Sequence, residues 1–306
     1  MRPRHAAQLV LLAGLWGASY LLIKYALEDF SPGAVVFLRT GVASLALYAL
    51  IRFRGGLGRE AIGDARRRPG SALALGLLGI AAPFLLIAFG ELEVDSGLTA
   101  VLVAPAALFV ALLAPLIDPS ERMTSRQVVG LFVGIAGIGL LVGVETVQTT
   151  AELIGALGIL GAALSYALAS FVVKRSYGGV PAETSSLISV AAAALLTLPF
   201  ALADLPDHAP GARAVAAIIV LGVGGTAIAF VLYYRLIAEL GAGQATLVSY
   251  LVPPLSLAYG AVLLDESVTV AALVGLVLIL AGVALAARRS DSAGEQAAHG
   301  GASLRV

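Results

Sequence analysis

The sequence predicts an all-α integral membrane protein whose ten transmembrane helices form two inverted five-helix repeats. Three observations support this fold class. Of the 306 residues, 59% are hydrophobic and only 12% are charged, whereas a soluble domain carries about 25% charged residues. Ten apolar runs, each about as long as a bilayer is thick, are separated by short polar connections. The second half of the chain also repeats glycines and acids of the first half at a constant spacing.

The ten runs are expected to be helices because they are continuously apolar, without the alternation of strands that face lipid and a lumen. About twenty helical residues, each rising about 1.5 Å, cross a hydrocarbon core of about 30 Å. The first run, from Ala6 to Leu27, is too long for a signal peptide and has no cleavage site after it. The expected helices are residues 6–27, 33–53, 71–90, 96–117, 126–144, 152–174, 182–203, 213–238, 242–264 and 268–288.

The connections between these runs alternate in charge. Arg and Lys are concentrated before the first run and in every second connection after it, as in Arg2, Arg4 and the stretch 52–68. The remaining connections carry mainly Asp and Glu, as in Glu28 and Asp29. Because cytoplasmic connections are enriched in Lys and Arg, we expect both termini to lie in the cytoplasm.

The second half of the chain repeats the first. Shifts of 145, 146 and 150 residues superimpose matching residues, namely Gly130 on Gly275, Gly137 on Gly282, Gly76 on Gly222, Gly79 on Gly225, Glu93 on Glu239 and Trp16 on Tyr166. Each half has an odd number of crossings, so the second must enter from the opposite side. We expect repeats at residues 1–146 and 147–289 and a disordered cytoplasmic tail at 290–306. Inverted repeats in carriers rock about a substrate site near the midplane.

Short motifs occupy characteristic places in the two halves. The first helix contains Leu15-Trp16-Gly17-Ala18-Ser19 and the second contains Leu38-Arg39. Glu121-Arg122-Met123-Thr124 in the first half matches Glu266-Ser267-Val268-Thr269 in the second. With these motifs the chain resembles the EamA family of the drug/metabolite transporter superfamily over about residues 6–288.

Three positions depart from the family pattern. Ser120 and Asp265 stand where the family usually has Gly before the Glu, and Tyr166 stands where the second repeat often has Trp. These departures affect loop geometry and pocket shape rather than membership. The resemblance implies a secondary carrier of the bacterial plasma membrane, often an exporter of amino acids or other small metabolites, and it leaves the substrate open.

Composition excludes several other classes. The formal net charge is +0, so binding of nucleic acid has no electrostatic support. The chain has no Cys, and its three His residues lie in tails or a loop, so we expect neither a metal nor another cofactor. No Ser with a base, no aspartate pair and no metal ligands occur at membrane depth. We therefore expect a transporter whose partners are a small-molecule substrate and the lipid bilayer, rather than an enzyme.

Arg39 is the most informative candidate for substrate binding. It lies about six residues, or roughly 9 Å, inside the second helix, where an Arg costs up to about 2.5–3.5 kcal/mol and requires a partner. One interpretation is a bidentate clamp for a substrate carboxylate. The other, which the sequence favours, is a structural bond to helix-end carbonyls or to Glu28 or Asp29. Lys24 lies at a similar depth and either extends to the headgroups or adds positive charge to a cavity.

Aromatic and hydroxyl side chains near mid-helix complete the candidate set. Trp16 and Tyr20 share one face of the first helix, and Tyr166 is the repeat equivalent of Trp16. We expect these side chains to line a central cavity, with packing or lipid contact as the alternative for each. The candidate substrate-binding residues are Trp16, Ser19, Tyr20, Lys24, Arg39, Phe84, Ser165, Tyr166, Phe230, Tyr233 and Tyr250.

Acidic residues bear on how transport is driven. No Asp or Glu lies near the middle of an expected helix, because Glu91 and Glu183 fall at helix ends. Proton relays and sodium sites usually need such a carboxylate, so the sequence slightly favours uncoupled transport. The predicted function is export of a small metabolite, an amino acid or a related zwitterion, by alternating access. The alternative is a carrier of a cationic drug, a nucleotide sugar or a lipid-linked sugar.

Overall fold

The computed structural model describes residues 3–53, 63, 67–117, 123–143, 148–176, 181–240, 245 and 247–287. The first half of the chain contributes α1 (Pro3–Leu27), α2 (Pro32–Phe53), α4 (Pro69–Gly76), α5 (Ala82–Gly90), α6 (Ser96–Val103), α7 (Ala106–Ile117) and α8 (Ser125–Gly143). The second half contributes α9 (Thr150–Ser176), α10 (Ala182–Ala203), α11 (Ala212–Val220), α12 (Ala229–Leu240), α14 (Val248–Leu263) and α15 (Val270–Ala287). Two π-helices, η1 (Leu77–Ala81) and η2 (Leu221–Ile228), join α4 to α5 and α11 to α12.

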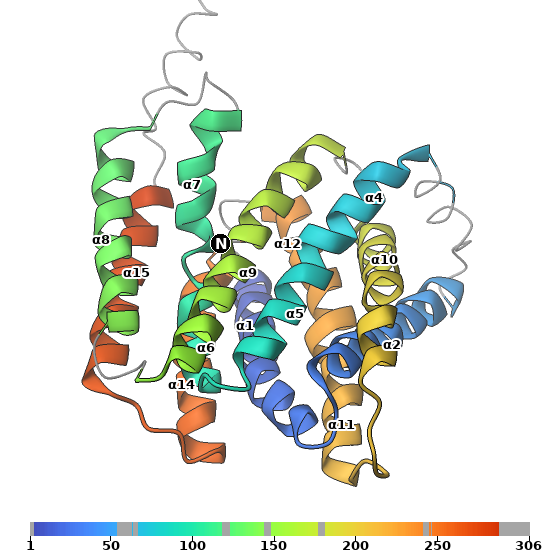
Figure 1. Ribbon diagram of the computed structural model, residues 1–306. Coiled ribbons are helices and arrows are strands. Elements are labelled where there is room, and N and C mark those ends of the chain that lie inside the picture. Colours follow the sequence, from blue (N-terminus) through green and yellow to red (C-terminus); the bar gives the residue numbers. More distant parts are fainter. Residues whose placement is uncertain are drawn as a thin grey trace, which may run out of the picture.

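These helices form a membrane-spanning bundle (Figure 1). In the described part of the chain, eight helical segments are long and apolar enough to cross a bilayer, and α14 and α15 are shorter apolar helices. The all-helical fold with ten spans is therefore confirmed. Observed and expected boundaries agree to within a few residues except at α14, which begins at Val248 rather than near residue 242. Part of the segment before α14 and the expected tail at 290–306 lie outside the described residues.

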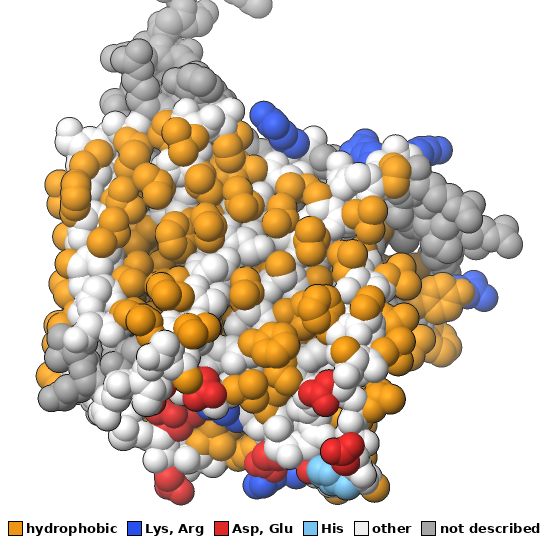
Figure 2. All heavy atoms as spheres, in the orientation of Figure 1, with side chains coloured by type: hydrophobic (Ala, Val, Ile, Leu, Met, Phe, Trp, Pro, Cys, Tyr) orange, Lys and Arg blue, Asp and Glu red, His pale blue; other side chains and the backbone are white. Residues whose placement is uncertain are grey.

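Apolar side chains cover the side of the bundle between two polar ends (Figure 2). Asp, Glu and His gather at one end, here called the acidic end, which is formed by the connections 28–31, 91–95, 204–211 and 264–269. Lys and Arg lie mainly at the opposite, basic end. Between them, large apolar side chains such as Leu45 face outward with 72% of their surface exposed. A lipid environment explains this exposed apolar surface.

The closest helix contacts join one half of the chain to the other. α8 packs along α15, and α2 packs along α10, as the two most extensive helix pairs. A Cβ atom at Gly130 would lie 2.6 Å from the carbonyl oxygen of Gly282, and one at Gly137 would lie 3.0 Å from that of Gly275. The repeat shift places Gly130 on Gly275 and Gly137 on Gly282, so the two contacts exchange. α8 and α15 therefore cross as antiparallel partners about a pseudo-two-fold axis.

The same symmetry relates contacts of the two π-helices. A Cβ atom at Gly225 in η2 would lie 2.5 Å from Oγ of Ser19 on α1. One at Gly79 in η1 would lie 3.6 Å from Cβ of Ala169 on α9. The repeat shifts place Gly79 on Gly225 and Ser19 on Ala169. Each π-helix thus packs on the first helix of the other half.

A proline accounts for the hydrogen bonding of η1. In a π-helix each N–H donates to the carbonyl five residues earlier, as Ala82 does to Leu77. Pro83 has no N–H, so the carbonyl of Leu78 loses its donor. Ser165 on α9 replaces it, donating from Oγ to the Leu78 oxygen at 2.8 Å. A side chain from the second half thus completes the backbone hydrogen bonding of the first.

Substitution of Gly130 tests the close packing of α8 on α15. We expect Gly130→Ala to destabilise the protein by about 1–3 kcal/mol, because the new methyl group would overlap backbone that has little room to move. Gly139→Ala on the same helix is the matched control, since nothing lies within 4 Å of its Cβ position. Thermal unfolding in detergent should show a lower midpoint only for Gly130→Ala. Equal midpoints for the two variants would contradict the packing.

Candidate functional site

Arg39 on α2 lies buried where the two halves of the chain meet. Only 3% of its surface is exposed. Its Nε and Nη2 atoms both donate to Oγ1 of Thr226 in η2, at 3.3 and 3.2 Å. Its guanidinium carbon lies 4.0 Å from the centre of the Phe84 ring on α5, within range of a cation–π interaction. Arg39 therefore connects one helix of its own half with the π-helix of the other.

The carboxylates expected as structural partners of Arg39 bind elsewhere. Glu28 accepts hydrogen bonds from Arg213, and Asp29 bonds to His208 and to the main-chain N–H of Gly211. The hydrogen bond from His208 lowers the pKa of Asp29 below its ordinary value. The prediction of a Glu28 or Asp29 partner for Arg39 is therefore wrong. Both acids instead tie the first half to the second at the acidic end.

Other titratable groups surround Arg39. Tyr166 on α9, Glu91 after α5 and Tyr20 on α1 lie near it, and of these only Glu91 carries a charge when ionised near neutral pH. Lys24, one turn beyond Tyr20, donates from Nζ to the main-chain oxygen of Glu91 at 2.6 Å. Lys24 therefore points into the protein rather than extending to the headgroups. We call Tyr20, Lys24, Arg39, Glu91 and Tyr166 the polar cluster.

Glu91 is the member that sequence reasoning missed. It follows the last residue of its span, a position expected to lie at an interface, yet only 1% of its surface is exposed. Neither carboxylate oxygen has a hydrogen-bond partner among the described residues. Burial raises the pKa of Glu91 well above its ordinary value, and the charge of Lys24 opposes that rise. The sequence offered one sign of this burial, the adjacent Gly90. A Cβ atom at Gly90 would lie only 2.6 Å from Ile159 on α9, so a glycine is needed where α9 covers this turn.

Aromatic side chains form a second group beside the polar cluster. The ring centres of Trp16 and Tyr233 are 5.1 Å apart, and those of Trp16 and Phe230 are 6.2 Å apart. Tyr234 contacts both Phe230 and Tyr233. Trp16 comes from α1 and the other three from α12, so this group also joins the two halves. We call Trp16, Phe230, Tyr233 and Tyr234 the aromatic cluster.

The structure brings most of the predicted site residues together. Six of them belong to or pack against one core of buried side chains, and these are Trp16, Tyr20, Phe84, Tyr166, Phe230 and Tyr233. The hydroxyl of Ser19 is used within α1, where it donates to the Leu15 oxygen at 2.8 Å, and that of Ser165 binds Leu78 as described above. Tyr250 packs against a different core, to which α15 contributes more buried side chains than any other helix, together with α6 and α9, and so lies apart from the others.

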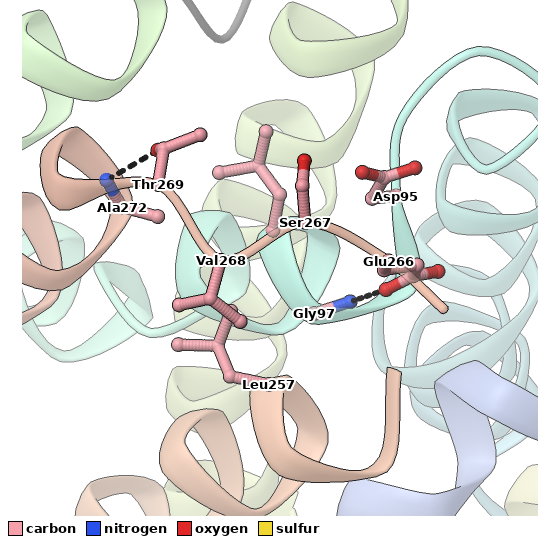
Figure 3. A pocket seen from close by; sticks show the side chains of 9 residues that line it. Asp95, Gly97, Leu257, Glu266, Ser267, Val268, Thr269 and Ala272 are labelled. Atoms are coloured by element: carbon pink, nitrogen blue, oxygen red, sulfur yellow. Dashed lines mark hydrogen bonds between the residues drawn. The ribbon is translucent and has the colours of Figure 1, made fainter. Parts of the chain in front are cut away.

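A small pocket lies at the acidic end, where the second half contacts the start of α6 (Figure 3). Its volume is ≈ 110 Å³, and its lining includes Asp95, Gly97 and Glu266. The Glu266 carboxylate accepts hydrogen bonds from the N–H groups of Ser96 and Gly97 at 2.8 and 3.0 Å and from Oγ of Ser96 at 2.9 Å. A carboxylate at a helix N-terminus also interacts favourably with the helix dipole. The described residues include no group of three or more His, Asp or Glu that could hold a metal ion.

Replacement of Thr226 tests the hydrogen bonding of Arg39. Thr226→Val removes the acceptor of both Arg39 bonds and leaves buried guanidinium donors unpaired. We expect a loss of about 1.5–3 kcal/mol of stability, the usual size for hydrogen bonds to charged groups. Thr226→Ser retains the hydroxyl and should unfold close to the wild-type temperature. If both variants unfold at that temperature, the Arg39–Thr226 contact contributes nothing to stability.

Comparison with known proteins adds an independent observation. Residues 5–143 and 153–288 each match the model of the EamA-like transporter family. A protein of Streptantibioticus cattleyicolor named "probable terminal-alkyne amino-acid exporter" is 31% identical over 285 residues, which cover 92% of this chain and 93% of that protein. A Salmonella typhimurium protein named "probable amino-acid metabolite efflux pump" is 26% identical, covering 90% and 91%.

Two further similarities bear on the family and the fold. An uncharacterized transporter of Bacillus subtilis is 24% identical over 272 residues, covering 88% of this chain and 91% of that protein. A solved crystal structure superposes with a TM-score of 0.65 at 20% identity, covering 94% of this chain and 97% of the other. That superposition shows a shared fold.

Proposed function

The chain belongs to the EamA-like transporter family and is a multi-pass membrane transporter rather than an enzyme, and from this premise we propose that it exports an amino acid or a related zwitterion by alternating access. One relative is named as a probable amino-acid exporter and another as a probable amino-acid metabolite efflux pump, and both names support export of a metabolite. We assign the moving units to residues 1–146 and 147–289. The two separate family matches and the glycine contacts that exchange under the repeat support this division.

The charge distribution supports an orientation for the transporter. The acidic end would face outward and the basic end, with both termini, would face the cytoplasm, because cytoplasmic connections are enriched in Arg and Lys. A bacterial plasma membrane is the corresponding location, and the bacterial relatives support it. In this orientation, the contacts of Glu28 with Arg213 and of Asp29 with His208 close the outer side.

Buried Arg39 is the observation that carries the choice of substrate. A guanidinium group has five N–H donors, and the bonds of Arg39 in the described structure use Nε and Nη2, both to Thr226. Its remaining donors are left for a ligand. A substrate carboxylate fits this need because it binds guanidinium bidentately and charge-assisted hydrogen bonds are the strong ones. Lys24 adds positive charge nearby.

The partner of Arg39 and the aromatic cluster lie on one continuous helical segment. Thr226, which binds Arg39, precedes Phe230 by only four residues. Phe230 contacts Trp16 and Tyr234. A ligand with its carboxylate at Arg39 can therefore place its side chain against these rings once the halves separate. Burial of an apolar side chain there would add to the binding free energy.

A cationic substrate is the second candidate, and Glu91 is the observation that favours it. A buried carboxylate without hydrogen bonds attracts a positive ligand. However, Lys24 and Arg39 lie within electrostatic range of Glu91 and would repel a ligand that carries only positive charge. A zwitterion matches both signs of charge, so we favour it.

Ligand binding and exchange test the proposed substrate class. Purified protein is screened against the standard amino acids by thermal stabilisation, and those that stabilise it are tested for exchange of labelled for unlabelled amino acid across liposomes. We expect saturable exchange that the corresponding amino acid amide does not inhibit, because the amide lacks the carboxylate that Arg39 binds. Inhibition by the amide and by organic cations, without inhibition by amino acids, would instead favour the cationic substrate.

Two substitutions of Arg39 separate substrate binding from structure. Arg39→Lys retains the charge and Arg39→Gln removes it, while both lose the paired bonds to Thr226. We expect the two variants to lose similar amounts of thermal stability. The exchange rate of Arg39→Gln should be about tenfold lower than that of Arg39→Lys, since about 1.4 kcal/mol of lost binding free energy corresponds to a tenfold weaker affinity. Equal exchange rates in the two variants would assign Arg39 a structural role alone.

A further inference from the structure

Glu91 combines complete burial with a lack of hydrogen bonds. It lies between α5 and α6 at the acidic end, with 1% of its surface exposed and both carboxylate oxygens without donors among the described residues. An ionised carboxylate in such a place loses its hydration without replacement, whereas a neutral carboxylic acid loses far less. The closed acidic end therefore favours a form of Glu91 whose charge is cancelled.

The nearby cations are bound to other groups. Lys24 on α1 donates to the main-chain oxygen of Glu91 rather than to its carboxylate, and Arg39 on α2 donates to Thr226. Their charges still act on Glu91 at longer range. Lys24 and Arg39 thus favour a negative charge on Glu91 without forming an ion pair with its carboxylate.

The other groups that face Glu91 do not neutralise it. Tyr20 on α1 is uncharged, and Glu266, in the connection after α14, adds a like charge that disfavours the ionised form. α9 packs on the same turn through Gly155 and Ile159, which carry no charge. Neutralisation of Glu91 in the closed state therefore requires a ligand from solution.

We propose that Glu91 is a proton-binding site, occupied by a proton when the empty carrier closes and by the ammonium group of the substrate when the loaded carrier closes. The inference rests on the proposed export of a zwitterion and names the proton as its exchange partner. A proton enters from the acidic end, binds a carboxylate oxygen and leaves when the basic end opens. The substrate then takes its place, so each cycle exchanges one proton for one substrate. This assignment replaces uncoupled transport, which the sequence slightly favours.

The acidic end carries two further carboxylates near Glu91. Asp95 and Glu266 line the small pocket there, and Figure 3 shows Glu266 within the connection between α14 and α15. The negative charge of Glu266 disfavours ionisation of both Asp95 and Glu91. It therefore favours a proton on Glu91 when the site holds no substrate.

Transport driven by a pH gradient tests the coupling. Liposomes with a lumen one pH unit more acidic than the bath, and with the membrane potential clamped by potassium and valinomycin, are given each amino acid that the exchange assay identifies. Wild type should accumulate it about tenfold, the ratio that one exchanged proton supports at this gradient. Glu91→Gln, which can neither bind the proton nor pair with the ammonium group, should exchange labelled for unlabelled amino acid more slowly than wild type and accumulate none. Glu93→Gln, an exposed acid on the same connection, is the matched control and should behave as wild type.

A second measurement needs no substrate. Trp16 is the single tryptophan of the chain and contacts rings of the other half, so its fluorescence reports how the halves are arranged. We expect the fluorescence of wild type and Glu93→Gln to change with pH through one transition that is absent in Glu91→Gln.

The outcomes of these two measurements separate the inference from the proposed function. If wild type exchanges amino acids but does not accumulate them in an acidic lumen, the proton site is overturned while export stands, and this result does not depend on how any variant folds. Accumulation that persists in Glu91→Gln also overturns it. If wild type exchanges no amino acid, the proposed function fails, and the titration of Trp16 alone then decides the proton site: a single transition lost in Glu91→Gln supports it, and a flat wild-type curve rejects it.

Discussion

Backbone contact between the two halves is the constraint on which the rest of the structure depends. At Gly130 and Gly282 the helices approach so closely that a single methyl group would overlap main-chain atoms, and at Gly137 and Gly275 a Cβ atom would lie 3.0 and 3.2 Å from the main-chain oxygen of the facing glycine. In a bilayer such contacts matter because helices associate through close packing rather than through the hydrophobic effect. The contacts also exchange under the repeat, so α8 and α15 hold each other in one matched register.

The position of the polar groups follows from this packing. Gly222 and Gly225 allow η2 to lie directly against α2 and α1, which brings Thr226 within hydrogen-bond distance of Arg39. Gly90 allows α9 to cover the turn that carries Glu91. Ionisable groups at membrane depth are costly, and here they lie at the surfaces that the two halves share. Separation of the halves would expose these groups to water. The closed form is therefore less favourable by the lost hydration of their charges, and a charged ligand that binds them can offset this loss.

Sequence reasoning identified the parts of this arrangement that leave a local pattern. Continuous apolar runs marked the spans, and glycines in constant register marked the repeat. Arg39 was recognised as needing a partner because its depth follows from counting residues along one helix. Trp16 and Tyr20 were assigned to a central cavity by their shared helix face, and Tyr166 by its equivalence to Trp16 in the repeat.

Other features depend on packing between distant segments and left no such pattern. Thr226, the partner of Arg39, lies 187 residues away and offers a hydroxyl group, which no charge pattern reveals. Glu91 looked like an interfacial acid because its burial comes from α9, not from its own neighbours. Pro83 lacks a main-chain N–H, but only the packing of α9 shows that Ser165 supplies the missing donor. Tyr250 was assigned to the site by its depth, yet its helix face turns to the other core.

Transport by alternating access requires the two halves to separate at the acidic end. Because the chain has no cysteine, Glu28→Cys and Arg213→Cys introduce the only thiols, at side chains that bond across the halves. A reducible thiosulfonate cross-linker joins them in liposomes, and exchange of amino acid is measured before cross-linking, after it and after reduction. We expect cross-linking to stop exchange and reduction to restore it. Exchange at the full rate in completely cross-linked protein would show that transport does not need the halves to separate at the acidic end.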